Sequence, residues 1–329
     1  MQAIAYPSAG LAAMITRAAS KQTYTTIRAL VPPEHRGDAF RAYGYFRWVD
    51  DLLDGDVLNS QEQLAFLASQ KQLLDQCLQG QPPRDLTAEE WLLVELTQGS
   101  LAGDPGLRIY LQDMMAVMDF DVQRRGKRIS QLQLDGYSRL LATAVTEAVY
   151  TFIGEECGAP QTTDRYLAAD AAHIVHMLRD LHEDLEIGYI NIPYEVLEGE
   201  RIDPTVLKDA KVRAWVQGRV ETAREYFTRG DAYLDMIDNP RCRLAGAWYA
   251  ARFEGILAAI EREDYYLRRD YSDCKGGRMM LQMAWQGLQA ILVTPYPHKT
   301  TSIQAEPIRA TAWEQLQMTP LPCEESLQK

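Results

Sequence analysis

The sequence divides into helix-length segments, and no run of alternating apolar and polar residues lasts long enough to predict a sheet. Proline and glycine cluster at several chain breaks: residues 32–33, 80–87, 103–106, 158–160, 199–204 and 238–240. The chain has neither internal repeats nor an interior linker typical of a domain boundary. We therefore predict one all-α domain over residues 1–293, built as a helical bundle, and a polar, proline-containing C-terminal tail over residues 294–329.

The charge balance and the cysteines limit the classes of partner and compartment. With 46 acidic against 34 basic side chains, the formal net charge is −12. This argues against a nucleic-acid partner, because a phosphate backbone needs a clustered basic surface. The five cysteines are scattered and form no C-x-x-C pair, which is typical of reduced thiols, and the N-terminus lacks the basic region of a signal peptide, so we expect a cytoplasmic protein. The apolar segment 279–293 contains three glutamines, which favours a buried helix over a transmembrane one and leaves a peripheral membrane contact open.

Two acidic clusters interrupt segments that are otherwise apolar. The first is DDLLD at residues 50–54, and the second is RDLHEDLE at residues 179–186. Each contains two aspartates four residues apart, which share one face of a helix, and each has an arginine one to three residues before its first aspartate. A solvated acidic face is the ordinary interpretation of such a run. The repeated D-x-x-x-D spacing, each time after a strongly apolar run, instead favours a functional site made of two parts.

Carboxylates on two facing helices suit Mg²⁺, since this ion takes oxygen ligands and usually shares its coordination shell with substrate phosphates. Arginines beside them would add charge-assisted hydrogen bonds to a diphosphate. A carboxylate-bridged di-iron site is excluded because no histidine has a glutamate three residues before it. Three roles stay open for His173 and His176: ligands of a small transition-metal site, hydrogen-bond donors in a pocket, or core residues. Nucleophile motifs and phosphate-binding loops are absent, which favours metal-assisted ionisation over acyl or phosphoryl transfer.

The segments around both clusters resemble the aspartate-rich motifs of the squalene/phytoene synthase family. YGYFRWVDDLLD (43–54) is similar to the first motif, and HIVHMLRDLHEDLEIGYINIP (173–193) is similar to the second. Further similar stretches, at 20–36, 136–149 and 251–271, follow in the family's order. The resemblance implies a single-domain isoprenoid-synthase helical bundle with a central cavity, in which Mg²⁺ ions are bound between facing aspartates and the substrate is a prenyl diphosphate.

The resemblance also implies roles for individual residues. It gives catalytic Mg²⁺ ligands at Asp50, Asp54, Asp180 and Asp184, a catalytic tyrosine at Tyr137, diphosphate-binding groups at Arg47, Arg179 and Lys21, and pocket positions at Tyr43, His173, His176 and Glu147.

Several of these positions depart from the family's pattern. His173 and His176 stand where glutamine and asparagine are common, Glu147 follows a stretch of small residues, and Tyr189 and Asn191 replace a basic residue and a tyrosine. Fewer phosphate donors should weaken one anion subsite while sparing ionisation at the other. The altered pocket is polar enough to receive a second small-molecule acceptor.

Three functions therefore stand at this point. The leading one is a Mg²⁺-dependent prenyltransferase that ionises farnesyl or geranylgeranyl diphosphate and condenses two prenyl chains head to head, with release of pyrophosphate. The alternative is a divergent relative that transfers one prenyl group to a non-prenyl acceptor such as an amine, or cyclises a single chain. A non-catalytic scaffold is disfavoured, because buried acids that repel one another would only destabilise it. Chain length, acceptor, product and oligomeric state cannot be predicted.

Overall fold

The computed structural model describes residues 8–55, 57–154, 162–197, 204–275 and 316. Nearly all of these residues are helical or connect helices, and the described part of the chain contains no strand, only an isolated bridge between Arg128 and Ile190. The all-α prediction is confirmed. The predicted helix at 279–293 and the predicted tail at 294–329, apart from Leu316, lie outside the described residues.

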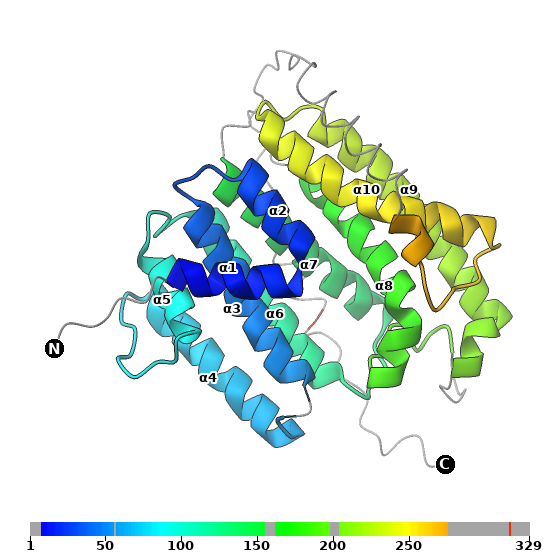
Figure 1. Cartoon of the computed structure of the whole chain (residues 1–329). Helices are drawn as coiled ribbons and strands as arrows, with labels where there is room; N and C mark the ends of the chain where they lie inside the picture. Colours follow the sequence, from blue (N-terminus) through cyan, green and yellow to red (C-terminus); the bar gives the residue numbers. More distant parts are fainter. Residues whose placement is uncertain (1–7, 56, 155–161, 198–203, 276–315, 317–329) are drawn as a thin grey trace. The chain divides into compact units, whose positions relative to one another are not determined.

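Ten α-helices and three short 3₁₀ helices are described (Figure 1): α1 (Ser8–Ala19), α2 (Lys21–Leu30), α3 (Arg36–Asp54), α4 (Ser60–Leu78), α5 (Glu90–Gln98), α6 (Pro105–Arg124), α7 (Gln131–Ile153), η1 (Thr163–Tyr166), α8 (Leu167–Ile187), η2 (Pro204–Lys208), α9 (Ala210–Leu234), α10 (Pro240–Arg262) and η3 (Ser272–Lys275).

The helix ends follow local sequence signals. At the start of α10, the Asn239 side chain accepts a hydrogen bond from the backbone N–H of Arg241 at 2.9 Å, and Pro240 occupies the first helical turn, where its missing N–H costs nothing. The breaks predicted at 32–33, 80–87, 103–106 and 238–240 are confirmed, whereas 158–160 and most of 199–204 lie outside the described residues. The breaks at residue 20 between α1 and α2, at 55–59 between α3 and α4, and at 125–130 between α6 and α7 were not predicted.

The described residues belong to two compact units whose sequences interleave. The first unit contains residues up to 122 together with 147–155, and the second contains 123–146 together with the chain from 156 onward. Helices α6 and α7 therefore contribute residues to both. Each unit is described by itself below.

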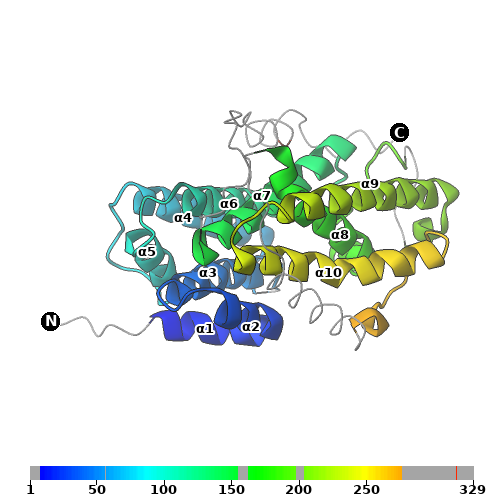
Figure 2. The same ribbon diagram turned by 90° about the horizontal axis from the view of Figure 1, so that it is seen from above.

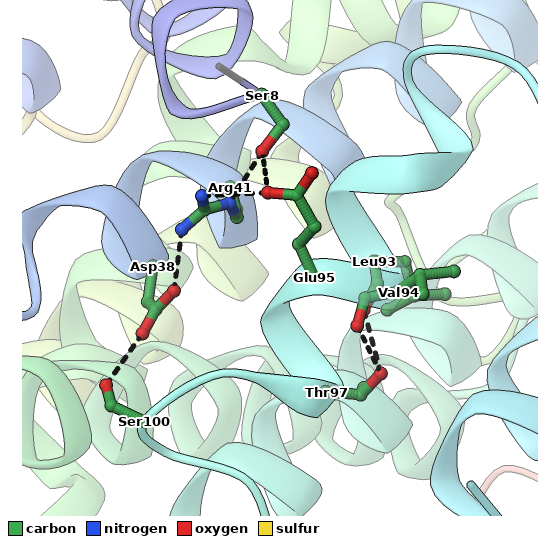
Figure 3. A network of polar contacts seen from close by, with 8 residues as sticks. All are labelled: Ser8, Asp38, Arg41, Leu93, Val94, Glu95, Thr97 and Ser100. Carbon is green, nitrogen blue, oxygen red and sulfur yellow. Dashed lines mark hydrogen bonds and ion pairs between the residues drawn. The ribbon is translucent and has the colours of Figure 1, made fainter. Parts of the chain in front are cut away.

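In the first unit a polar network joins three helices (Figure 3). The guanidinium of Arg41 on α3 donates to Ser8 at 2.8 Å, to Asp38 at 2.8 Å and to Glu95 at 2.9 Å. Ser8 on α1 also donates to Glu95 on α5, and Ser100 donates to Asp38 at 3.1 Å. Because α3 packs against both α1 and α5, this network fixes the helix that carries the first acidic cluster.

In the second unit α8 packs against α9 and α10, and the three helices run side by side in both views (Figures 1 and 2). Ala171, Val175 and Leu178 of α8 are at most 1% exposed and lie in the core of this unit. Gly230 of α9 allows a close approach, because a Cβ there would lie 2.5 Å from the backbone nitrogen of Ala168. The first turns of α8 are thus held rigidly, and its last turns carry the second acidic cluster.

Candidate active site

The first acidic cluster lies in the last two turns of α3. Phe46, Val49 and Leu53 anchor this part of the helix in the core, each at most 4% exposed. Asp50 and Asp54, four residues apart, lie one above the other at the edge of this buried face, because Asp50 follows Phe46 by four residues. The spacing predicted from the sequence therefore produces a carboxylate pair on a rigid element.

Arg47 lies within this cluster. Its Nη1 is 3.3 Å from Oδ2 of Asp50, and its Nη2 donates to Asp51. The Arg47 side chain is 40% exposed to solvent, and the Asp51 side chain is 53% exposed. Asp51 therefore serves as a surface partner of the arginine, while Asp50 connects the arginine to the carboxylate pair.

Asp50 carries charge that its surroundings do not balance. Burial raises the pKa of its carboxyl to about 7, and the neighbouring charge of Asp54 contributes to the rise. Arg47 opposes this shift, but Asp121 of α6 and Asp51 add to it. A buried carboxyl group beside other carboxylates is hard to ionise, and a bound cation stabilises its ionised form. We call Arg47, Asp50, Asp54 and Asp121 the first half-site.

Tyr43 belongs to the same region. Burial raises the pKa of its phenol, and the positive charge of Arg47 and hydrogen bonding with Thr23 and Ser20 act in the opposite direction. The phenol ring is therefore near the start of α2 and close to Arg47, and its role as a pocket residue stays a prediction. Lys21 is exposed at the first position of α2, directly after the capping residue Ser20; its role in diphosphate binding stays a prediction.

Glu147 is buried, at 6% exposure, beside the first turn of α6. A Cβ at Gly106 would lie 3.2 Å from Oε2 of Glu147 and 2.4 Å from the Thr151 hydroxyl, so the carboxylate sits close to the backbone at the start of a helix. A helix N-terminus favours a negative charge. This local support gives Glu147 a structural reason to be buried, and its role as a pocket residue stays a prediction.

The second acidic cluster lies in the last turns of α8, and its first aspartate is already paired. Asp180 accepts hydrogen bonds from Arg179 and lies 2.9 Å from Nε2 of His176. Burial alone would raise the pKa of Asp180, but the hydrogen bonds and charges of Arg179 and His176 outweigh burial and hold the pKa well below its usual range. Asp180 therefore stays ionised.

Asp184 is held by a chain of contacts that begins outside α8. It accepts a hydrogen bond from Nδ2 of Asn191 at 2.7 Å, and Oδ1 of Asn191 accepts one from Arg124 at 2.6 Å. The guanidinium carbon of Arg124 lies 4.7 Å from the ring centre of Tyr137 and 4.9 Å from that of Tyr189. The predicted catalytic tyrosine is thus part of the support of Asp184. We call Arg179, Asp180, Asp184 and Asn191 the second half-site.

The two histidines of α8 face α10. Nε2 of His173 lies 3.3 Å from the Tyr249 hydroxyl, and burial lowers the pKa of His173 to about 3, so its ring is neutral at physiological pH. The His176 ring packs at 5.8 Å from that of Phe253, over which Arg179 also lies at 6.0 Å. His173 and His176 therefore join the second half-site to an aromatic wall on α10.

The donor atoms fit a divalent metal ion, most clearly in the first half-site. Its carboxylates are hard oxygen ligands, and the raised pKa of Asp50 reflects first its burial and then the repulsion from Asp54. In the second half-site Asp180 and Asp184 have donors of their own. Within either unit, as far as the chain is described, no three His, Cys, Asp or Glu side chains gather closely enough to hold a metal ion. The assignment of four metal ligands therefore stays a prediction.

Three residues of these half-sites and their surroundings were not predicted from the sequence. Asp121 interrupts the apolar face of α6 beside buried Phe120, which is the kind of signal that identified Asp50. Arg124 and Tyr249 have no distinctive local pattern. Their contacts depend on how α6 and α10 pack against distant segments, so only the structure reveals them.

Comparison with known proteins matches most of the chain. A family model described as squalene/phytoene synthase matches residues 16–275. The chain is 26% identical over 280 residues to the 15-cis-phytoene synthase of a Synechocystis strain, covering 80% of each protein. It is 28% identical over 279 residues to the presqualene diphosphate synthase of Zymomonas mobilis, covering 78% of this chain and 87% of that protein.

Solved structures show the same fold. A squalene synthase from Alicyclobacillus acidocaldarius has a TM-score of 0.64 and 20% sequence identity, covering 79% of this chain and 95% of the other. A dehydrosqualene synthase has a TM-score of 0.62 and 16% identity, covering 86% of this chain and 95% of the other. These similarities confirm the predicted helical isoprenoid-synthase fold. Among the described residues, no helix is both long and apolar enough to span a membrane.

Proposed function

The chain belongs to the squalene/phytoene synthase family and is a transferase of prenyl groups, and from this premise we propose that it condenses two prenyl diphosphates head to head, using Mg²⁺ and releasing pyrophosphate. The matched relatives are named for phytoene and presqualene diphosphate synthesis, which supports farnesyl or geranylgeranyl diphosphate as substrate. The match over residues 16–275 supports one catalytic domain within residues 1–293, with residues 294–329 as a tail. The cytoplasmic location stays a prediction.

The observation that carries the proposal is the repeated pairing of a D-x-x-x-D carboxylate pair with an arginine. In the first half-site Arg47 contacts Asp50, and in the second Arg179 contacts Asp180. Bound Mg²⁺ would supply neutralisation of the departing diphosphate. Each guanidinium group is proposed to bind phosphate oxygens of the diphosphate that the neighbouring carboxylates hold through the metal, and Lys21 is proposed to assist them.

The remaining side chains suit an allylic cation. The aromatic rings of Tyr43, Tyr249 and Phe253 can shield positive charge, because the face of an aromatic ring attracts cations. His173 is neutral, so it adds polarity beside Tyr249 without repelling a cation. In the condensation, the bond between carbon and diphosphate oxygen breaks in one substrate. The double bond of the second substrate then attacks that carbon, and one proton is lost as the cyclopropyl ring closes.

Incubation with farnesyl or geranylgeranyl diphosphate and Mg²⁺, followed by measurement of pyrophosphate and mass spectrometry of the products, tests this proposal. We expect pyrophosphate release that stops with EDTA, and a product that contains two prenyl chains. Asp50→Asn and Asp180→Asn should each lower the rate at least about a hundredfold if they remove metal ligands, whereas Asp51→Asn should retain most of the activity. A product with one prenyl group joined to an amine would contradict head-to-head condensation, an outcome that the comparisons do not favour. Full activity in Asp50→Asn would refute the metal assignment.

A further inference from the structure

We propose that Arg124 is a positioning residue, which orients the Asn191 amide and through it fixes the carboxylate of Asp184. This inference rests on the proposed function, in which Asp184 is a metal ligand. Arg124 itself contacts neither the proposed metal nor the substrate in this assignment. Its effect would be transmitted through one asparagine side chain.

The chemistry of the two hydrogen bonds fixes the direction of the amide. A guanidinium group has only donors, so the Asn191 atom that faces Arg124 at 2.6 Å must be the carbonyl oxygen. The NH₂ group must then face Asp184, to which it donates at 2.7 Å. If the amide were flipped, an NH₂ group would meet the donors of Arg124 and a carbonyl oxygen would meet a carboxylate. Arg124 therefore determines that Asp184 receives a hydrogen-bond donor.

Arg124 is held too firmly to turn away. It is only 4% exposed, and its guanidinium group lies over the rings of Tyr137 and Tyr189, at 4.7 Å and 4.9 Å from their centres. Cation–π contacts with two aromatic rings stabilise the planar guanidinium group and restrict its rotation. Asn191 is also buried, at 2% exposure.

The backbone fixes the register between Arg124 and Asn191. The break between α6 and α7 runs beside the segment that follows α8, where the N–H of Gly126 donates to the carbonyl of Gly188 at 2.8 Å. Further along, the N–H of Tyr194 donates to the carbonyl of Ile129 at 3.0 Å. Gly188 ends α8 with a φ of 96°, a conformation that side chains disfavour. These two backbone contacts lie on either side of Asn191 in its own segment, and both follow Arg124 in the other segment, so they fix the register between the two residues.

A carboxylate ligand depends on such outer partners, because they fix its rotamer and its basicity. Loss of one typically weakens metal binding about 10–100-fold. Without Arg124, the Asn191 amide could flip and the donor to Asp184 would be lost. We call the contacts that connect Arg124 through Asn191 to Asp184 the relay. It predicts that the effects of Arg124 and Asn191 on metal binding are not independent.

The test is a double-mutant cycle of Arg124→Met and Asn191→Leu in the full chain. Electron paramagnetic resonance measures the binding of Mn²⁺ in the presence of inorganic pyrophosphate, without turnover. We expect Arg124→Met to weaken Mn²⁺ binding about tenfold in the otherwise unchanged chain and less than about twofold in the Asn191→Leu background. Additive effects, or unchanged or tighter binding in Arg124→Met, would overturn the inference.

Two further variants separate positioning from packing. Arg125→Met is the matched control: Arg125 lies 5.7 Å from the ring of Tyr189 and donates to the Ile187 carbonyl, whereas the guanidinium that donates to Asn191 is that of Arg124. Mn²⁺ binding in Arg125→Met should stay within about twofold. Arg124→Lys keeps a donor for Asn191, so it should bind Mn²⁺ more tightly than Arg124→Met. If Arg124→Met does not fold, Arg124→Lys is compared with Asn191→Leu, and Mn²⁺ binding as weak in the first as in the second would by itself overturn the inference.

The proposed function fails in a different way. Asp184→Asn should weaken Mn²⁺ binding more than any relay variant does, because it removes the ligand itself. If Asp184→Asn binds Mn²⁺ as the unchanged chain does, the metal assignment is wrong, and the positioning role falls with it. If Asp184→Asn loses binding while Arg124→Met keeps it, only the positioning role is wrong.

Discussion

Replacing Asp50 with asparagine should stabilise the protein in the absence of divalent metal, and the gain should grow as the pH rises. Burial and the charge of Asp54 raise the pKa of Asp50 from 3.8 to about 7. At pH values between the unfolded-state pKa and the higher folded-state pKa, the folded protein holds more of this proton than the unfolded protein does. The free energy of unfolding therefore falls as the pH rises from about 4 to about 7, and the full penalty remains above that range. Asparagine carries no charge and removes this penalty.

The size of the effect follows from the pKa and the exposure of the side chain. A pKa displaced from 3.8 to about 7 corresponds to an upper limit of about 4 kcal/mol. The Asp50 side chain keeps 36% of its exposure, so water screens much of this electrostatic penalty. We therefore expect Asp50→Asn to raise the free energy of unfolding by about 1–2 kcal/mol at pH 8. For a chain of this length, that gain raises the melting temperature by about 2 °C. Near pH 5.5 the gain should be about half as large.

Thermal unfolding in EDTA at about pH 5.5 and about pH 8 measures the effect. The control is Asp51→Asn, which loses a surface ion pair with Arg47 and the smallest of the repulsions on Asp50, and it should change stability by less than about 1 kcal/mol at both pH values. Added Mg²⁺ should raise the melting temperature of the unchanged chain more than that of Asp50→Asn, because only the former keeps this ligand. An Asp50→Asn protein that is no more stable at pH 8, or equally stabilised at both pH values, would refute the reasoning.

Two other substitutions test the packing around the second half-site. Gly230→Ala should lower the free energy of unfolding by about 1–3 kcal/mol, because the new Cβ would lie 2.5 Å from the backbone of α8. Gly218→Ala on the same helix, where a Cβ meets open space, should raise it by about 0.5–1 kcal/mol. Equal melting temperatures of the two variants would contradict this contrast. Tyr249→Phe should cost about 1–3 kcal/mol, because it leaves buried His173 without the hydroxyl 3.3 Å from its Nε2, and chemical unfolding that detects no loss would show that this contact does not matter for stability.

What the sequence could predict is what a single helix determines. The four-residue spacing places Asp50 above Asp54 and Asp180 above Asp184 in any α-helix, whatever it packs against. An arginine one or three residues before an aspartate is likewise within reach, as the Arg179 contact with Asp180 shows. The all-α fold follows from the same periodicity, since it too depends on local spacing.

What the sequence could not predict depends on contacts between distant segments. Tyr189 and Asn191 look like lost phosphate donors when compared with the family's pattern, but in the structure Tyr189 stacks on Arg124 and Asn191 binds it. The separation of 67 positions between Arg124 and Asn191 hides this relation from any local pattern. The unpredicted break at 125–130 is what brings the two segments together.

The two half-sites also differ in how their charge is balanced, and this difference bears on metal binding. Asp50 is pushed toward its protonated form by burial and by neighbouring carboxylates, so a cation there relieves repulsion that already exists. Asp180 is held ionised by Arg179 and His176, so a cation there must share the carboxylate with donors that are already bound. Binding at the first half-site should therefore release a proton near pH 7, and binding at the second should not. Proton release measured by calorimetry in buffers of different ionisation enthalpy distinguishes the two, and Asp50→Asn should abolish it.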